Sequence, residues 1–157
     1  MQSVLPELAS ATADRAFVFD GSPDWTPAHG LAVLEAKGAV GLAFVQLEQI
    51  RDSAHPVPKG WLADRLTALW TMFTASRREA NAGAVTIWMA EYIRLLDDLP
   101  WDIVAVAIDD AVRNAKHGFM PAVGEIRAIA NPLVENRKRL IERLSATVEY
   151  LSEQSAK

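Results

Sequence analysis

The residues best placed for acid–base chemistry are the carboxylates on either side of Pro100. Asp98 and Asp102 could approach each other across this proline, and paired carboxyl groups can serve as general acid and general base. The helix dipole, however, favours acidic residues at a helix start without any catalytic role, and the pair Asp109–Asp110 is expected to face solvent. We therefore expect these carboxylates to be structural, and we predict no catalytic residue.

The histidines, and the motifs that mark other kinds of active site, lead to the same expectation. His29, His55 and His117 lie far apart, and none has a second ligand at helical spacing, so we expect no metal site. The chain has no cysteine, which excludes disulfides and thiolate metal sites and fits a reducing compartment. It contains neither a GxxxxGK[ST] phosphate loop nor a Gly-x-Ser-x-Gly elbow, so we expect no ATP hydrolysis by the chain itself and no cofactor.

Basic side chains gather towards the end of the chain, where acidic ones are interleaved with them. This alternation is typical of a solvated helix face with ion pairs, but a shallow nucleic-acid contact and a protein-docking helix are open alternatives. The formal net charge of −4 argues against a protein whose main role is to coat nucleic acid, so we expect weak or no direct binding. The basic residues are Arg137, Lys138, Arg139 and Arg143, and the acidic ones are Glu135, Glu142 and Glu149.

The elements that would position these residues are helical throughout. Apolar residues recur at steps of three and four between short breaks containing Pro or Gly, which predicts about five to seven amphipathic helices and essentially no sheet. The short connections favour an all-α fold, a compact antiparallel helical bundle with an N-terminal arm and a charged C-terminal amphipathic helix. The core should bury Trp70, Trp88, Tyr92, Ile108 and Val112 together. The expected helices span about residues 27–37, 39–51, 60–76, 84–97, 100–117, 121–130 and 133–154.

Breaks in this pattern divide the chain into three parts. Residues 1–56 form an N-terminal arm and accessory helices, because residues 1 to about 25 lack a sustained period and are expected to be extended or loosely held. Residues 57–131 begin within the proline-rich linker His55–Pro58 and form the helical core domain. Residues 132–157 follow the break at Asn131–Pro132 and form a charged amphipathic helix outside that core.

The C-terminal helix carries an apolar seam that should not stay in water. Its residues recur at three–four–three spacing over about two heptads, which is too few to indicate a coiled coil. We expect the seam to need a partner, either a second copy of the chain or another protein, which would take it as an amphipathic helix in a groove. The seam consists of Ile141, Leu144, Val148 and Leu151.

One stretch, within residues 61–130, resembles a known family. An Ala/Val-rich helix lies between two short motifs, and a helix that begins near a Glu-Ile pair follows the second. These features are similar to those of the small phage helicase loader/inhibitor proteins and their prophage-encoded relatives. The chain departs from that pattern at Ala122–Val123, where many relatives have a Ser/Thr-Pro pair that caps the last helix. The motifs are Tyr92-Ile93-x-Leu95-Leu96-x-Asp98-Leu99-Pro100, Gly118-Phe119-Met120-Pro121 and Glu125-Ile126.

The resemblance implies an all-helical protein that acts by contact and without catalysis. Family members bind the replicative DnaB-type helicase and deliver it to an origin-bound initiator, and a flexible C-terminal part engages the helicase. We therefore expect a phage or prophage DNA-replication accessory protein that binds the replicative helicase or another replication protein through the Phe119–Met120 corner and the C-terminal seam. The alternatives are a helical DNA-binding regulator that uses the four basic residues above, and a self-associating phage interaction or inhibitor protein.

The sequence also bears on location. Its first ten residues lack the basic start and the continuous apolar stretch of a secretory signal. The most apolar run, residues 38–47, is far shorter than the roughly 20 residues that span a bilayer. Within it, Phe44 is expected on the apolar face of a helix. We expect a soluble, cytoplasmic protein that does not associate with a membrane.

Overall fold

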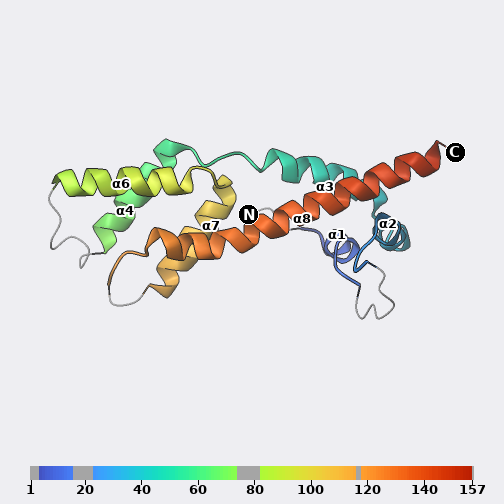
Figure 1. The fold of residues 1–157 in the computed structure, drawn as a ribbon, viewed down its shortest axis with the longest axis horizontal. Coiled ribbons are helices and arrows are strands. Elements are labelled where there is room, and N and C mark those ends of the chain that lie inside the picture. Colours follow the sequence, from blue (N-terminus) through green and yellow to red (C-terminus); the bar gives the residue numbers. More distant parts are fainter. Residues whose placement is uncertain (1–3, 16–22, 74–81, 116–117, 157) are drawn as a thin grey trace. The chain divides into compact units, whose positions relative to one another are not determined.

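The computed structural model describes residues 4–15, 23–73, 82–115 and 118–156, and these residues form seven α-helices (Figure 1). The described residues contain no strand, and their one isolated β-bridge joins Pro56 and Pro100. The prediction of an all-α fold is therefore confirmed. The helices are α1 (Pro6–Ala11), α2 (Pro27–Ala36), α3 (Val40–Asp52), α4 (Lys59–Met72), α6 (Ala82–Leu96), α7 (Trp101–Asn114) and α8 (Val123–Ser155).

The chain divides into two compact units. Unit 1 comprises the described residues of 53–134, and unit 2 comprises those up to 52 together with those from 135 onward. The helix α8 contributes its first part to unit 1 and its remainder to unit 2. The expected N-terminal part (residues 1–56) and C-terminal part (residues 132–157) thus contribute most of their described residues to one unit.

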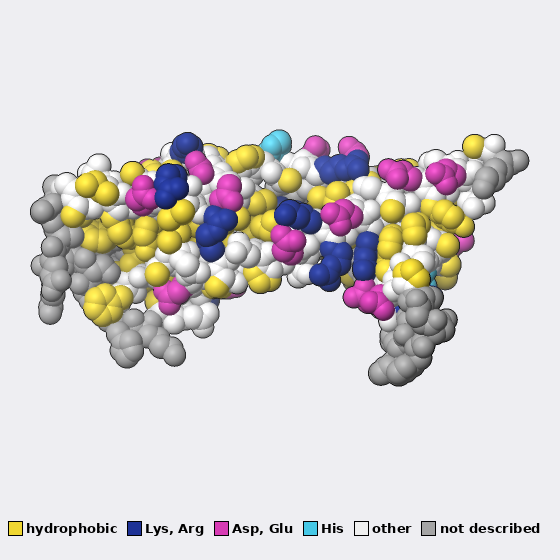
Figure 2. All heavy atoms as spheres, in the orientation of Figure 1, with side chains coloured by type: hydrophobic (Ala, Val, Ile, Leu, Met, Phe, Trp, Pro, Cys, Tyr) yellow, Lys and Arg dark blue, Asp and Glu magenta, His cyan; other side chains and the backbone are white. Residues whose placement is uncertain are grey.

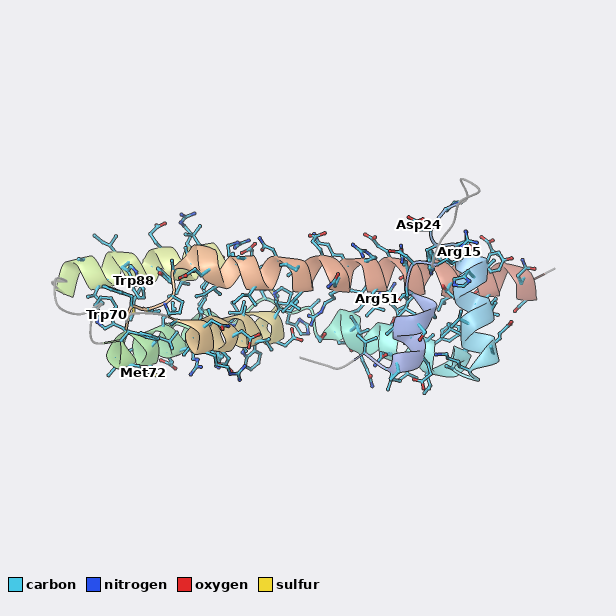
Figure 3. The ribbon with its side chains drawn as sticks, turned by 90° about the horizontal axis from the view of Figure 1, so that it is seen from below. Arg15, Asp24, Arg51, Trp70, Met72 and Trp88 are labelled. Atoms are coloured by element: carbon cyan, nitrogen blue, oxygen red, sulfur yellow. The ribbon has the colours of Figure 1, made fainter. Side chains whose placement is uncertain are left out.

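Unit 1 has a core of aliphatic side chains from α4, α6, α7 and the first part of α8. The predicted aromatic cluster lies against this core, and Trp70 and Trp88 lie near each other in it (Figure 3). The ring centroids of Trp70 and Trp88 are 5.1 Å apart, and those of Trp88 and Tyr92 are 4.1 Å apart. Ile108 is fully buried, whereas the three aromatic rings and Val112 are partly buried. The fully buried side chains include Leu62, Leu66, Leu69, Leu96, Ile103, Val104, Ala107, Ile126 and Ala130.

The two proline-containing connections of unit 1 pair with each other. The Val57 N–H donates to the Leu99 carbonyl at 3.1 Å, and the Trp101 N–H donates to the His55 carbonyl at 3.0 Å. Because proline lacks an N–H and restrains the residue before it from helix, both segments leave the helical path. Their exchange of hydrogen bonds satisfies backbone groups at the starts of α4 and α7.

Unit 2 is built where α1, α2 and α3 pack with α8. The Thr26 side chain caps α2 by accepting a hydrogen bond from the His29 N–H at 3.2 Å, and Pro27 begins the helix, as the sequence predicts. Gly30 allows a close approach to α8, since a Cβ at this position would lie 2.7 Å from the Thr147 Oγ1. The buried apolar residues of this core are Leu8, Ala11, Leu34, Ala39, Ala43, Leu47, Ile50, Leu140 and Leu144.

The expectation of a loosely held N-terminal arm is wrong for the described residues before 16. Residues Pro6–Ala11 form α1, and Leu8 is fully buried in the core of unit 2. The Leu5 N–H donates to the Gln46 side chain at 3.1 Å, and the Arg143 side chain donates to the Thr12 carbonyl at 2.6 Å. A six-residue helix is too short to show a periodic pattern, so its stability depends on tertiary contacts.

The expected break at Asn131–Pro132 is also wrong, because α8 continues through Pro132. A proline inside a helix removes one hydrogen bond and costs about 3 kcal/mol. Pro132 and Ala128, whose carbonyl loses its helical donor, are both exposed, so water can satisfy that carbonyl. Ala130, before the proline in the chain, and Leu140, after it, are both buried, and this packing offsets the cost.

Length and hydropathy of the helices bear on the membrane expectation. Among the described residues, no single helix is both long enough and apolar enough to cross a bilayer. The helices α2 and α3 reach these limits only as a pair, and they are bent by 118° at the break between them.

Candidate partner-binding corner

The corner between α7 and α8 presents one aromatic side chain to solvent. Phe119 is 58% exposed, although it lies next to the core of unit 1. Gly118 precedes it with φ of 70°, a left-handed conformation that glycine adopts without strain. The helix α7 ends earlier than the predicted residue 117, at Asn114, where the C-cap Ala115 is extended. Met120 and Pro121 follow it, and both are buried. The backbone therefore turns sharply before Phe119 and is anchored directly after it.

Two further contacts hold the anchored side of this corner. The Tyr92 hydroxyl donates to the Pro121 carbonyl at 3.2 Å, and burial raises the pKa of Tyr92, so the phenol keeps the proton that it donates. The Ala122 N–H donates to the Glu125 carboxylate at 2.6 Å. Glu125 thus supplies a cap for α8 in the place where the Ser/Thr-Pro pair of the resembled family is missing.

Of the two residues expected to contact a partner at this corner, Phe119 and Met120, only Phe119 is accessible. Met120 is 9% exposed and packs into the core of unit 1, so it does not form part of an open contact surface. Of these two adjacent residues, Phe119 is exposed and Met120 is buried. The prediction is corrected to Phe119 alone.

The C-terminal seam is not an unpartnered surface. Leu144 is fully buried, and Ile141 and Val148 are partly buried against the core of unit 2. Leu151 is also half-buried. The expectation that this seam needs an outside partner is therefore wrong, because α1, α2 and α3 of the same chain cover it. Part of this cover comes from α1, which lies in a segment without a sustained hydrophobic period.

The four basic residues of α8 have different roles. Arg143 donates to the Thr12 carbonyl and, at 2.5 Å, to Asp14, and its guanidinium lies 5.2 Å from the centre of the Trp25 ring. Lys138 forms an exposed ion pair with Glu135, Arg137 has an interaction partner in the chain, and Arg139 is exposed. Figure 2 shows Lys and Arg side chains interspersed with Asp and Glu on the visible face. Arg143 and Lys138 thus each pair with a carboxylate of the same chain.

Three of the carboxylates considered for acid–base chemistry have basic partners, and a fourth, Asp102, has an interaction in the chain. Asp98 bonds to Arg127, Asp109 pairs with Arg65, and Asp110 pairs with Arg113. Asp109 and Asp110 are half-buried, so the expectation that they face solvent is only partly met. Among the described residues, no group of three or more His, Cys, Asp or Glu could hold a metal ion, and His117 lies outside those residues.

The helix α3 has exposed apolar side chains that its sequence pattern did not predict. Leu42, Phe44 and Val45 are all exposed, and Phe44 lies outside the core to which its spacing assigned it. The buried side of α3 is centred on Ala43, Leu47 and Ile50 instead. A signal was present, because the run at 38–47 is apolar on every face of a helix, so some of its side chains must face solvent.

Comparisons of the chain with protein families, with curated proteins and with solved structures find no match.

Proposed function

We propose that this protein acts without catalysis, as a replication accessory protein that binds a DnaB-type replicative helicase, and that Phe119 is the centre of the contact. The resemblance of residues 61–130 to helicase loader/inhibitor proteins supports the choice of partner. The observation that carries the proposal is the exposed aromatic ring of Phe119 between Gly118, at positive φ, and the buried Met120.

The buried residues directly after Phe119 suit this role. Buried aromatic anchors dominate the energy of many protein interfaces. A side chain whose backbone is already fixed loses less conformational freedom when it binds, so more of its burial energy appears as affinity. Phe119 is 58% exposed and would become buried only in an interface, and the buried Met120 and Pro121 hold the backbone directly after it.

Such a contact would act by shifting the state of the helicase ring. A ligand changes a conformational equilibrium only by the difference between its affinities for the two states. Loading and inhibition both require this difference, on the order of several kcal/mol if one state is to dominate. The protein would work in the cytoplasm beside the helicase, which agrees with the absence of cysteine.

Co-elution with the purified DnaB-type helicase of the organism that encodes the chain tests this proposal. Size-exclusion chromatography with light scattering is run on the chain alone, with the helicase, and with duplex DNA at about 0.15 M salt. The proposal predicts a stable complex with the helicase and none with DNA. A complex with DNA and none with the helicase would favour the DNA-binding regulator instead.

A second candidate is self-association through α3. Its exposed Leu42, Phe44 and Val45 favour this candidate, because exposed large apolar side chains that lie close together commonly mark an interaction surface. The light-scattering mass of the chain alone distinguishes the two. A dimer that Val45→Asp converts to monomer would support self-association, whereas a monomer at all concentrations would exclude it.

A further inference from the structure

A second candidate binding site lies in unit 1 and shares no residue with the Phe119 corner. It is an open depression of about 500 Å³ with mostly apolar walls. Volumes of this size are common for sites that take a small molecule or one large side chain. The lining residues are Ser53, His55, Trp61, Trp101, Asp102 and Ala105.

The walls of this depression are fixed by the paired proline connections. Trp101 begins α7, and its N–H donates to the His55 carbonyl at 3.0 Å, so the two sides of the depression are hydrogen-bonded to each other. The ring centroids of Trp61 and Trp101 are 5.9 Å apart, and their planes meet at 62°. The two indoles therefore form two walls at an angle, and Trp101 is left 45% exposed.

The chemistry of the walls favours a cation. The face of an indole ring carries partial negative charge and attracts cations within about 6 Å of its centre. Asp102 adds a carboxylate beside Trp101, in the first turn of α7, and makes a further interaction in the chain. The lining residues include this one acidic residue and neither Lys nor Arg, so their formal charge favours a cation over an anion.

Among cations, a guanidinium fits these groups best. It is planar and can stack on an indole face while its N–H groups donate in parallel to a carboxylate. An ammonium group is a strongly hydrated point charge and gains less from the flat ring. We propose that this depression binds an arginine side chain of a partner protein. The inference does not depend on whether that partner is a helicase.

Short peptides test the site on the full, unmodified chain. The probes are Ac-Ala-Arg-Ala-NH₂ and the same peptide with citrulline, which has nearly the shape of arginine and no charge. The indole N–H signals of Trp61 and Trp101 are followed by ¹H–¹⁵N NMR and assigned with single Trp→Phe variants. The arginine peptide should shift both signals in a saturable manner and leave that of Trp70 in place, and the citrulline peptide should bind at least about fivefold more weakly.

A pair of variants separates the charge of Asp102 from the overall charge of the unit. Asp102→Asn should weaken binding of the arginine peptide by about fivefold or more. Glu91→Gln removes an equal charge from an exposed position on α6, outside the depression, and should leave binding unchanged. Equal binding of the two peptides, no shift with either, or equal loss in both variants would overturn the proposal. The peptide comparison decides the matter even if Asp102→Asn fails to fold.

Discussion

Arg127 on α8 holds the carboxylate of Asp98 with two parallel hydrogen bonds, Nη1 to Oδ1 at 2.8 Å and Nη2 to Oδ2 at 2.9 Å. The same guanidinium donates to the Leu95 carbonyl at the end of α6. This arrangement satisfies a carbonyl that the helix end would leave without a donor. It also ties the connection between α6 and α7 to α8, directly after the corner that presents Phe119.

The pairing predicts a pH dependence of stability. Hydrogen bonds from Arg127 lower the pKa of Asp98 below its ordinary value. Because the folded-state pKa is below that of the unfolded chain, the pair stabilises the protein above the ordinary carboxyl pKa. This contribution is lost as the pH falls through the lowered folded pKa. Both side chains are partly exposed, so we expect Asp98→Asn to cost at most about 1 kcal/mol at neutral pH.

Urea unfolding of the parent chain and of Asp98→Asn between pH 7 and pH 2.5 checks this expectation. The difference in the free energy of unfolding should shrink towards zero in acid. Glu91→Gln serves as a comparison for the size of the effect: Arg94 also lowers the pKa of Glu91, but this exposed pair lies within α6 and joins no separate elements, so its difference should be smaller at neutral pH. A difference that grows as the pH falls would contradict the assigned direction of the pKa change.

Two glycine substitutions should change stability in opposite directions. In Gly30→Ala the new Cβ would lie 2.7 Å from the Thr147 Oγ1 and 3.2 Å from the Ala11 carbonyl, so α2 and α8 would have to separate. We expect a net loss of about 1–3 kcal/mol, despite the better helix propensity of alanine. In Gly41→Ala nothing lies within 4 Å of the new Cβ, and α3 should gain up to about 1 kcal/mol.

Thermal and urea unfolding of the two variants measure these effects. The comparison is internally matched, since both glycines lie in helices of unit 2 and the chemical change is the same. If Gly30→Ala were as stable as the parent chain, the close crossing of α2 and α8 would be wrong.

The C-terminal seam should behave as core. Leu144 is fully buried, so Leu144→Ala should cost about 2–5 kcal/mol. Leu151→Ala should cost less, since Leu151 is half-buried near the end of α8. Urea unfolding followed by far-UV circular dichroism measures both. Equal and small costs would restore the interpretation of the seam as an exposed docking surface.

Much of the fold could be predicted because helix periodicity is a local signal. The stripes of α4 and α7 and the proline start of α7 follow from the sequence alone. What could not be predicted depends on tertiary contacts. The local preferences of proline predict that a helix ends at Pro132, but the packing of residues on both sides of it outweighs them. The helix α1 is too short to show a hydrophobic period.

The candidate sites could likewise be predicted only in part. Phe119 stands out in the sequence between a glycine and a Met-Pro pair, so a corner there could be foreseen. The burial of Met120 could not, because it depends on how the segment meets the core. The Trp61–Trp101 depression could not be predicted from the sequence either, since it forms only when two connections that lie far apart in the chain pair with each other.

The most direct test of the proposed function is a titration of the purified helicase onto the immobilised chain by biolayer interferometry. The parent chain is compared with Phe119→Ala and with Ile87→Ala, a control that truncates a 69% exposed side chain on α6 of the same unit. We predict that Phe119→Ala raises the dissociation constant about tenfold or more, as expected for an aromatic anchor, and that Ile87→Ala leaves it unchanged. Saturable binding that is unaffected by Phe119→Ala, or no binding of the parent chain, would contradict the account.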